Sequence, residues 1–372
     1  MLNPVSFTNA LQKQGFSFFT GVPDSLLKEL CACITDTLGN DSHVIAANEG
    51  AAVALASGYH LATGKAGVVY MQNSGTGNAI NPLLSLADPS VYAIPMLVII
   101  GWRAEPGVHD EPQHVKQGEI QEALLASLGY PYEILSTDET EAHEQLTRLR
   151  ERMASDQSPV VLLVRKGSFT EYPVAKPGSP YVMSREQALS LILPELEPEA
   201  RIVSTTGKTS REIYELRDST GVDHSRDFLT VGSMGHAVSI ATGFAKFRPE
   251  LPVYCIDGDG AAIMHMGSLA VTASQRLANF KHILINNGAH ESVGGQPTAG
   301  FDFSFEALAK EFGYHTVATV TTAEELPKRI AELREAQGPA FLEVRVKPGA
   351  RKDLGRPRTT PQENKRAFME GL

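Results

Sequence analysis

Hydrophobic residues gather in short continuous runs along this chain. Runs without the alternation of half-exposed strands indicate strands buried on both faces of a parallel sheet. The clearest lie at residues 67–71, 96–100, 160–164, 253–256, 283–285 and 341–346. Between them apolar residues recur at helical spacing, as at 141–153 and 323–335. Strands that alternate with helices predict an α/β protein built on doubly wound parallel sheets.

Three segments of the first half recur in the second half, in the same order and at nearly the same spacing. The pairs are 52–59 (AVALASGY) with 237–244 (AVSIATGF), 122–130 with 306–314, and 159–165 with 339–345. Such a repeat predicts one fold used twice, by internal duplication. A stretch rich in Pro, Gly and Ser at 168–184 is interpreted as a linker between domains at 1–167 and 185–372.

Composition and charge narrow the class of protein. The 372 residues are 42% hydrophobic, which suits folded domains and excludes disorder. A formal net charge of -10 argues against a general nucleic-acid or membrane-surface binder, because those carry a basic face. No apolar run approaches the roughly 20 residues of a membrane-spanning helix, and no secretory leader is evident at the start. With only three Cys, we expect a soluble, cytoplasmic protein.

The strongest chemical signal lies at the ends of two neighbouring predicted strands. Residues 257–260 read Asp-Gly-Asp-Gly after one strand, and Asn286 and Asn287 follow the next. Taken alone, the first segment would be interpreted as a surface turn. Glycines let the backbone approach a phosphate, and carboxylate and amide oxygens are ligands that Mg²⁺ prefers. The pair of strand ends therefore predicts a site for Mg²⁺ and a diphosphate.

These residues resemble the cofactor-binding motif of the thiamine-diphosphate-dependent decarboxylase family, whose fold has a pyrimidine-binding and a pyrophosphate-binding domain. The resemblance assigns the first role to 1–167 and the second to 185–372. It implies that Asp259, Asn287 and the carbonyl of Ala289 bind Mg²⁺, with Asn286 as the alternative if the register shifts.

Two further positions match the same family. Glu49 precedes an Ala- and Gly-rich helix, where the family has a Glu that hydrogen-bonds the aminopyrimidine ring. Gly232 and Met234 match a loop in which the carbonyl binds the amino group and an apolar wedge bends the cofactor. In isolation, Glu49 is also a favourable helix-start carboxylate and Met234 an ordinary core residue. Glu49, Met234 and Asp259 occur in the order and in the halves of the chain that the family has, which favours a role in the cofactor site over these ordinary roles.

Gly207, Lys208 and Thr209 suggest a phosphate-binding P-loop. That motif also requires a glycine where Ile202 stands, so we reject it. The turn instead matches the family's first diphosphate-contacting turn, although Lys208 could equally be a solvated lysine at a helix start. The resemblance thus implies a cofactor-binding set of Glu49, Thr206, Gly207, Lys208, Gly232, Met234, Gly258, Asp259, Gly260, Ala261 and Asn287.

The chain has no room for the third domain that most such decarboxylases carry. It resembles the short phosphonopyruvate decarboxylases along its whole length, with the sulfopyruvate decarboxylases as nearest relatives. The matching segments are 21–27, 72–78, 101–103, 110–114, 206–212, 264–267 and 351–357. The implied reaction is decarboxylation of 3-phosphonopyruvate to phosphonoacetaldehyde and CO₂, within phosphonate and antibiotic biosynthesis.

The resemblance also suggests groups that act on the substrate. Asp24 and His114, and less clearly His109, are candidates for acid and base chemistry. A doubly anionic 2-oxoacid requires cationic partners, for which the candidates are Arg103, Lys208, Arg351 and Lys352. For each of these four, simple surface solvation remains an alternative.

In the family the cofactor bridges two chains, which implies at least a homodimer with active sites at the chain interface. The alternative functions are a sulfopyruvate decarboxylase and a non-catalytic thiamine-fold subunit.

Overall fold

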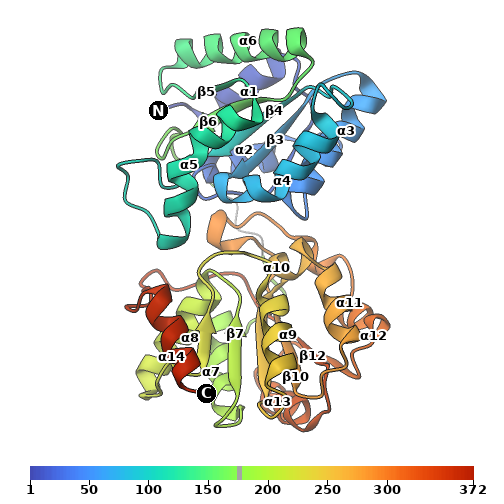
Figure 1. The fold of residues 1–372 in the computed structure, drawn as a ribbon, viewed down its shortest axis with the longest axis vertical. Helices are drawn as coiled ribbons and strands as arrows, with labels where there is room; N and C mark the ends of the chain where they lie inside the picture. The colour runs from blue at the N-terminus through green and yellow to red at the C-terminus, as the bar shows by residue number, and fades with distance from the viewer. Residues whose placement is uncertain (174–177) are drawn as a thin grey trace. The chain divides into compact units, whose positions relative to one another are not determined.

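The computed structural model describes residues 1–173 and 178–372 and divides the chain into two compact units. The first takes in Met1–Lys176 and Val293–Gln296; the second takes in Pro177–Ser292 and Pro297–Leu372. Each contains a six-stranded parallel sheet flanked by helices (Figure 1). The predicted α/β class is therefore confirmed. Part of the predicted linker, at 174–177, lies outside the described residues.

The first sheet has the strand order β2-β1-β3-β4-β6-β5. Its strands are β1 (Phe19–Gly21), β2 (His43–Ile45), β3 (Gly67–Gln72), β4 (Met96–Gly101), β5 (Tyr132–Ile134) and β6 (Val160–Val164). The helices of this unit are α1 (Pro4–Lys13), α2 (Lys28–Thr37), α3 (Glu49–Thr63), α4 (Thr76–Pro82), α5 (Pro112–Leu128) and α6 (Glu139–Asp156). Two shorter helical turns are η1 (Asn73–Gly75) and η2 (Leu83–Ala87).

The second sheet has the strand order β11-β12-β10-β9-β7-β8. Its strands are β7 (Arg201–Ser204), β8 (Asp227–Leu229), β9 (Val253–Gly258), β10 (Phe280–Asn286), β11 (Thr316–Val320) and β12 (Ala340–Arg345). The helices are α7 (Arg185–Ile192), α8 (Lys208–Thr220), α9 (Ala237–Phe247), α10 (Asp259–Met264), α11 (Gly267–Ser274), α12 (Phe305–Phe312), α13 (Leu326–Glu335) and α14 (Pro361–Glu370). Shorter turns are η3 (Leu193–Glu195), η4 (Glu291–Val293) and η5 (Ala299–Phe301).

The predicted duplication is visible in the topology. Read from its β8 edge, the second sheet places its own strands in the order second, first, third, fourth, sixth, fifth, and the first sheet has the same order. The repeated sequences occupy equivalent elements: 52–59 lies in α3 and 237–244 in α9. The helices α5 and α12 both end at a left-handed glycine, Gly129 or Gly313. The repeat in sequence is therefore a repeat in structure.

The continuous apolar runs are explained by burial on both sheet faces. In β4, Leu97 and Ile99 belong to the core under α1, α2 and α6, whereas Met96 and Val98 face the core under α3, α4 and α5. The second sheet is covered by α7, α8 and α13 on one face and by α9, α11 and α12 on the other. Full burial of such side chains contributes roughly 1.5–3 kcal/mol each, which favours unbroken apolar strands.

Polar segments begin where these strands end. In parallel α/β sheets ligands bind at the carboxyl ends of the strands, and most of the candidate residues follow β1, β2, β4, β7, β8, β9 and β10. Among the described residues, none of the helices combines the length and apolar character needed to cross a bilayer.

Candidate functional site

Asp259 is the first residue of α10, directly after β9, and only 3% of it is exposed. Its carboxylate accepts hydrogen bonds from the Thr298 hydroxyl and from the backbone N–H of Asn287 at 3.4 Å. Burial raises the pKa of Asp259 to about 6, although the hydrogen bonds from these neutral donors lower it. A buried carboxylate held only by neutral donors is suited to receive a divalent cation.

The two asparagines after β10 have different surroundings. Asn286 is fully buried and donates its side-chain amide to the Gly300 carbonyl at 2.6 Å and to Glu343 Oε1 at 2.8 Å. The backbone N–H of Asn287 donates a hydrogen bond to the Asp259 carboxylate. The side-chain oxygen of Asn287 accepts a hydrogen bond from the Ala289 N–H at 3.1 Å. This arrangement favours Asn287 over Asn286 as the partner of Asp259 in a metal site.

Glycines line this site closely. A Cβ atom at Gly300 would lie 2.7 Å from Asp259 Oδ2, and one at Gly260 would lie 3.1 Å from the His290 ring. Any larger residue would displace these groups. Close backbone packing, a buried carboxylate and an amide oxygen together fit a Mg²⁺ ion that also binds a diphosphate.

The turn at Thr206, Gly207 and Lys208 opens α8 after β7. Gly207 has a φ of 92°, and a Cβ atom there would lie 2.9 Å from Ser292 Oγ. A helix N-terminus after such a turn offers free N–H groups to an anion. Lys208 Nζ lies 3.1 Å from Glu291 Oε1, which places this turn beside the loop that follows Asn287.

Glu291 is a candidate site residue that the sequence analysis did not identify. Its carboxylate pairs with Lys208 and, at 2.6 Å, with Arg185, and it accepts the side-chain amide of Asn287 at 2.9 Å. Although burial opposes ionisation, the two cations hold its pKa below the usual value. Arg185 is itself buried and also pairs with Glu212 at 2.7 Å. No local motif marks Arg185, Glu212 or Glu291, so only the fold identifies them.

The predicted wedge, Met234, lies close to the start of α10. Its Cε atom is 3.4 Å from the position that a Gly260 Cβ would occupy. Left-handed backbone at Ser233 (φ 52°) and Gly235 (φ 83°) shapes this loop. The structure thus brings the loop of Gly232 and Met234 to the loop of Asp259.

In the first unit, Glu49 begins α3 and is 5% exposed. Its Oε2 accepts the Asn78 side-chain amide at 2.8 Å. Burial raises the pKa of Glu49, and the Asn78 hydrogen bond opposes that effect. A Cβ atom at Gly75 would lie 2.2 Å from Glu49 Oε1, so the backbone of η1 closes over this carboxylate.

Asp24 is fully buried after β1. Its carboxylate accepts the Gln72 side-chain amide at 2.5 Å and the Leu26 N–H at 3.2 Å. Burial raises the pKa of Asp24, while Gln72 and the Arg103 cation oppose the shift. A Cβ atom at Gly101 would lie 1.9 Å from Asp24 Oδ2. The side chain therefore faces the carboxyl ends of β3 and β4.

Arg103 lies near Asp24, and His114 lies near Arg103 and Asp110, whereas His109 is exposed in the loop before α5. The Arg103 guanidinium contacts Asp110 Oδ2 at 2.7 Å and Ser25 Oγ at 2.7 Å. Burial and the Arg103 cation lower the pKa of His114 to about 4, and its buried Nδ1 has no hydrogen-bond partner. Asp24, Arg103 and His114 form a polar group from distant parts of the sequence.

Arg351 and Lys352 have other surroundings. Arg351 pairs with Glu186 at 2.8 Å, with Asp353 at 3.4 Å and with Glu215. Lys352 is exposed. The Arg351 guanidinium is therefore occupied by carboxylates of α7, α8 and its own loop.

Models of two domain families match the chain. The thiamine pyrophosphate enzyme N-terminal TPP-binding domain matches residues 6–125, and the C-terminal TPP-binding domain matches residues 206–344. The first match contains Glu49 and the second contains Asp259 and Asn287.

Similar proteins extend over the full chain. A phosphonopyruvate decarboxylase of Streptomyces viridochromogenes is 34% identical over 99% of this chain and 94% of its own length. A phosphonopyruvate decarboxylase of Streptomyces hygroscopicus is 33% identical over 100% of this chain and 94% of its own length. A sulfopyruvate decarboxylase of Methanosarcina acetivorans is 26% identical over 100% of this chain and 98% of its own.

Proposed function

The chain belongs to the thiamine pyrophosphate enzyme family, and on that premise we propose that it decarboxylates 3-phosphonopyruvate to phosphonoacetaldehyde and CO₂. The observation that carries the proposal is full-length similarity, above 30% identity, to two phosphonopyruvate decarboxylases. Both cofactor-binding domains are present in one chain, which supports a complete enzyme over a non-catalytic subunit.

Asp259, Asn287 and the Ala289 carbonyl would hold Mg²⁺ at the diphosphate. The buried, cation-free carboxylate of Asp259 supports this role. Thiamine diphosphate supplies the electron sink that decarboxylation of a 2-oxoacid requires. The Thr206–Lys208 turn would bind the diphosphate through backbone N–H groups of α8, and Gly258, Gly260 and Ala261 would do so at α10.

Glu49 would hydrogen-bond the aminopyrimidine ring and exchange a proton with it. Its raised pKa and dry surroundings support this role, because a carboxyl group that retains a proton nearer neutral pH is a better acid catalyst. Met234 would support the bent cofactor, and the Gly232 carbonyl would accept from its amino group.

Asp24 and His114 are the proposed acid and base groups at the substrate. Burial raises the pKa of Asp24 and lowers that of His114, so near neutral pH the His114 imidazole is unprotonated and has a free nitrogen for a proton, although its low pKa makes it a weak base. His109 is a weaker candidate because it is exposed.

The cationic candidates for the substrate's phosphonate differ in how readily they could bind it. Arg103 lies beside Asp24, but it must share or release Asp110 to bind an anion. Lys208 would bind the substrate's phosphonate close to the cofactor's diphosphate. Arg351 and Lys352 stay weaker candidates, because one is paired with carboxylates and the other is exposed.

We also propose a homodimer as the minimal active form, with active sites at the chain interface. Exposed apolar side chains on α9 and α11 support a partner surface: Phe247 is 79% exposed, Val271 61% and Ile240 38%. The two helices pack together, and exposed apolar patches commonly mark interfaces. Residence in the cytoplasm and a place in phosphonate antibiotic biosynthesis remain predictions.

The test is an assay of the purified chain with thiamine diphosphate, Mg²⁺ and one of three acids: phosphonopyruvate, sulfopyruvate or pyruvate. Release of CO₂ and aldehyde is measured for each. We expect phosphonopyruvate to have the highest kcat/KM. A preference for sulfopyruvate would support the second candidate, which the full-length sulfopyruvate decarboxylase relative favours. Cofactor binding without turnover on any acid would contradict both.

A further inference from the structure

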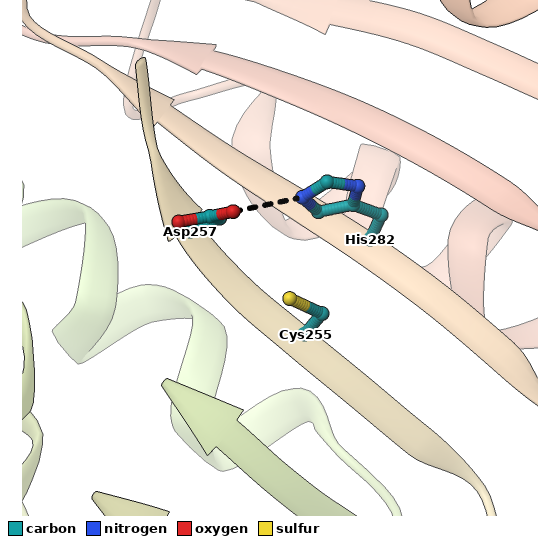
Figure 2. Close-up of side chains that lie close together, drawn as sticks. All are labelled: Cys255, Asp257 and His282. Carbon is teal, nitrogen blue, oxygen red and sulfur yellow. Dashed lines mark ion pairs between the residues drawn. The ribbon is translucent and has the colours of Figure 1, made fainter. Parts of the chain in front are cut away.

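Three side chains with metal-binding chemistry meet on one face of the second sheet. Strand β9 pairs with β10 so that Cys255 is opposite His282. Asp257, two residues after Cys255, points to the same face because side chains alternate along a strand. Figure 2 shows the thiol, the carboxylate and the imidazole converging. All three residues are fully buried.

Two polar atoms of this cluster lack partners. Asp257 Oδ2 and His282 Nε2 are buried without a hydrogen bond, and they lie 3.8 Å apart. That separation is too long for a direct hydrogen bond. Buried polar atoms without partners are costly and uncommon in folded proteins. A cation between these two atoms would give each of them a partner.

The other polar atoms of Asp257 and His282 already have contacts. Asp257 Oδ1 accepts the Gly258 N–H at 2.9 Å, and His282 Nδ1 lies 3.5 Å from the Tyr314 hydroxyl. Metal-binding histidines commonly use their second nitrogen in this way, which fixes the ring and leaves the first nitrogen free. Burial lowers the pKa of His282 to about 3, so the imidazole is neutral and can be a ligand.

The spacing suits one ion. The potential ligand atoms of Cys255, Asp257 and His282 all lie within 4.8 Å of one another. Metal–ligand bonds of about 2.0–2.3 Å at a tetrahedral ion place neighbouring ligand atoms roughly 3.3–3.8 Å apart. The 3.8 Å between Asp257 Oδ2 and His282 Nε2 is slightly longer than the roughly 3.3–3.6 Å expected for an oxygen and a nitrogen ligand at about 2.0–2.2 Å, so the two side chains move closer together when an ion binds.

We propose that Cys255, Asp257 and His282 form a second metal site, for a thiophilic divalent cation such as Zn²⁺, separate from the Mg²⁺ site proposed at Asp259 and Asn287. A thiolate with an imidazole and a carboxylate is a donor set for Zn²⁺, whereas Mg²⁺ prefers oxygen ligands alone. Three protein ligands leave one tetrahedral position for a water molecule.

Charge balance favours this ion in an apolar core. The Cys255 thiol loses its proton to solvent on binding, so one thiolate and one carboxylate neutralise a divalent cation. A site without net charge has a smaller desolvation cost in the surroundings of Phe305, Tyr314 and Phe341.

The test measures metal content and does not depend on decarboxylation. The full chain is produced in medium containing Zn²⁺, or Co²⁺ in a second preparation, so that the buried site is filled during folding. After dialysis against EDTA, we expect one ion per chain and, for Co²⁺, a near-ultraviolet thiolate charge-transfer band. Cys255→Ala and His282→Gln should each lose the retained ion.

Control variants separate this site from other binding. Cys31→Ala and Cys33→Ala remove the other thiols, which are also buried, and Asp259→Asn removes the proposed Mg²⁺ ligand. All three should keep the ion and the band. Absence of a retained ion in the unmodified chain, or a band that survives Cys255→Ala, would overturn the proposal. Circular dichroism of each variant distinguishes loss of the ion from loss of the fold.

Discussion

The buried carboxylate of Glu49 accepts a hydrogen bond from the side-chain amide of Asn78 at 2.8 Å. The two residues come from α3 and α4, which pack against each other in the first unit. The amide orients the carboxylate and opposes the rise in its pKa that burial causes. Asn78 is thus a positioning residue for the group that we propose acts on the cofactor ring.

Replacing Glu49→Gln should remove this proton exchange while it preserves shape. Because a positioned acid or base typically contributes about 10²–10⁴-fold to a rate, we expect kcat to fall by that order. Thiamine diphosphate binding, measured by calorimetry, should persist. The matched control is Glu144→Gln on α6, whose side chain is 63% exposed. Full turnover by Glu49→Gln would eliminate the proposed mechanism.

Asp259→Asn tests the proposed metal site. In the unmodified protein, Mg²⁺ with thiamine diphosphate should raise the thermal midpoint, because a ligand at about 100 times its Kd stabilises by about 2.7 kcal/mol. The variant should lose most of that increase, since an amide is a weaker Mg²⁺ ligand than a carboxylate. Asp302→Asn, at an exposed position, is the control and should keep the increase. An equal increase in both variants would rule out Asp259 as a ligand.

Glu291→Gln should strengthen binding of thiamine diphosphate. The carboxylate pairs with Arg185 and Lys208, so it competes with an incoming diphosphate for the same positive charge. Its removal should lower the Kd about tenfold, equivalent to about 1.4 kcal/mol, as measured by calorimetry. Glu186→Gln, which removes a partner of Arg351, should leave the Kd unchanged. Weaker binding by Glu291→Gln would mean that the carboxylate supports the site.

Gly118→Ala should destabilise the first unit. A Cβ atom at this position in α5 would lie 1.9 Å from the Ala104 carbonyl oxygen, and such overpacking costs about 1–3 kcal/mol. The Trp102 indole N–H donates to the Gly118 carbonyl at 3.0 Å, and Trp102 is the only tryptophan. Its fluorescence therefore reports unfolding in urea.

Gly58→Ala is the matched control for that substitution. Gly58 is in α3, and a Cβ atom there has no neighbour within 4 Å. Alanine favours a helix over glycine by about 0.5–1 kcal/mol, so this variant should be slightly more stable. Equal effects of the two substitutions would contradict the close approach of α5 to Ala104.

His43 should contribute to acid sensitivity. Its ring is buried beside the Tyr70 hydroxyl at 2.7 Å, and burial lowers its pKa from 6.5 to about 4. The unfolded chain therefore binds this proton first, and stability is lost as the pH falls from about 6.5 to about 4. His43→Gln should reduce the slope of unfolding free energy against pH in this window, as measured by urea titrations. His109→Gln, at an exposed position, should leave that slope unchanged.

Several features could be predicted because local sequence encodes them. Continuous apolar runs identified strands such as β4 and β6, since burial on both faces excludes polar residues. The repeated segments predicted the duplicated topology. Glu49, Asp259 and Asn287 could be proposed as site residues because each follows a strand end with a recognisable neighbourhood of small residues.

Other features could not be predicted. Arg185 and Glu291 meet across 106 positions of sequence, and Asp24 meets Gln72 across 48. The opposition of Cys255 to His282 depends on the register of two strands. No local sequence pattern indicates these contacts, because the paths of the loops and the register of the strands determine which side chains meet.

The fold class, the duplication and the residue types at the strand ends follow from the order of residues along the chain. Which charges neutralise one another, which carboxylates are buried, and therefore which pKa values shift, depend on how the chain folds in space. The physical reason is that strand burial and helix formation depend on neighbours in sequence, whereas desolvation and ion pairing depend on neighbours in space.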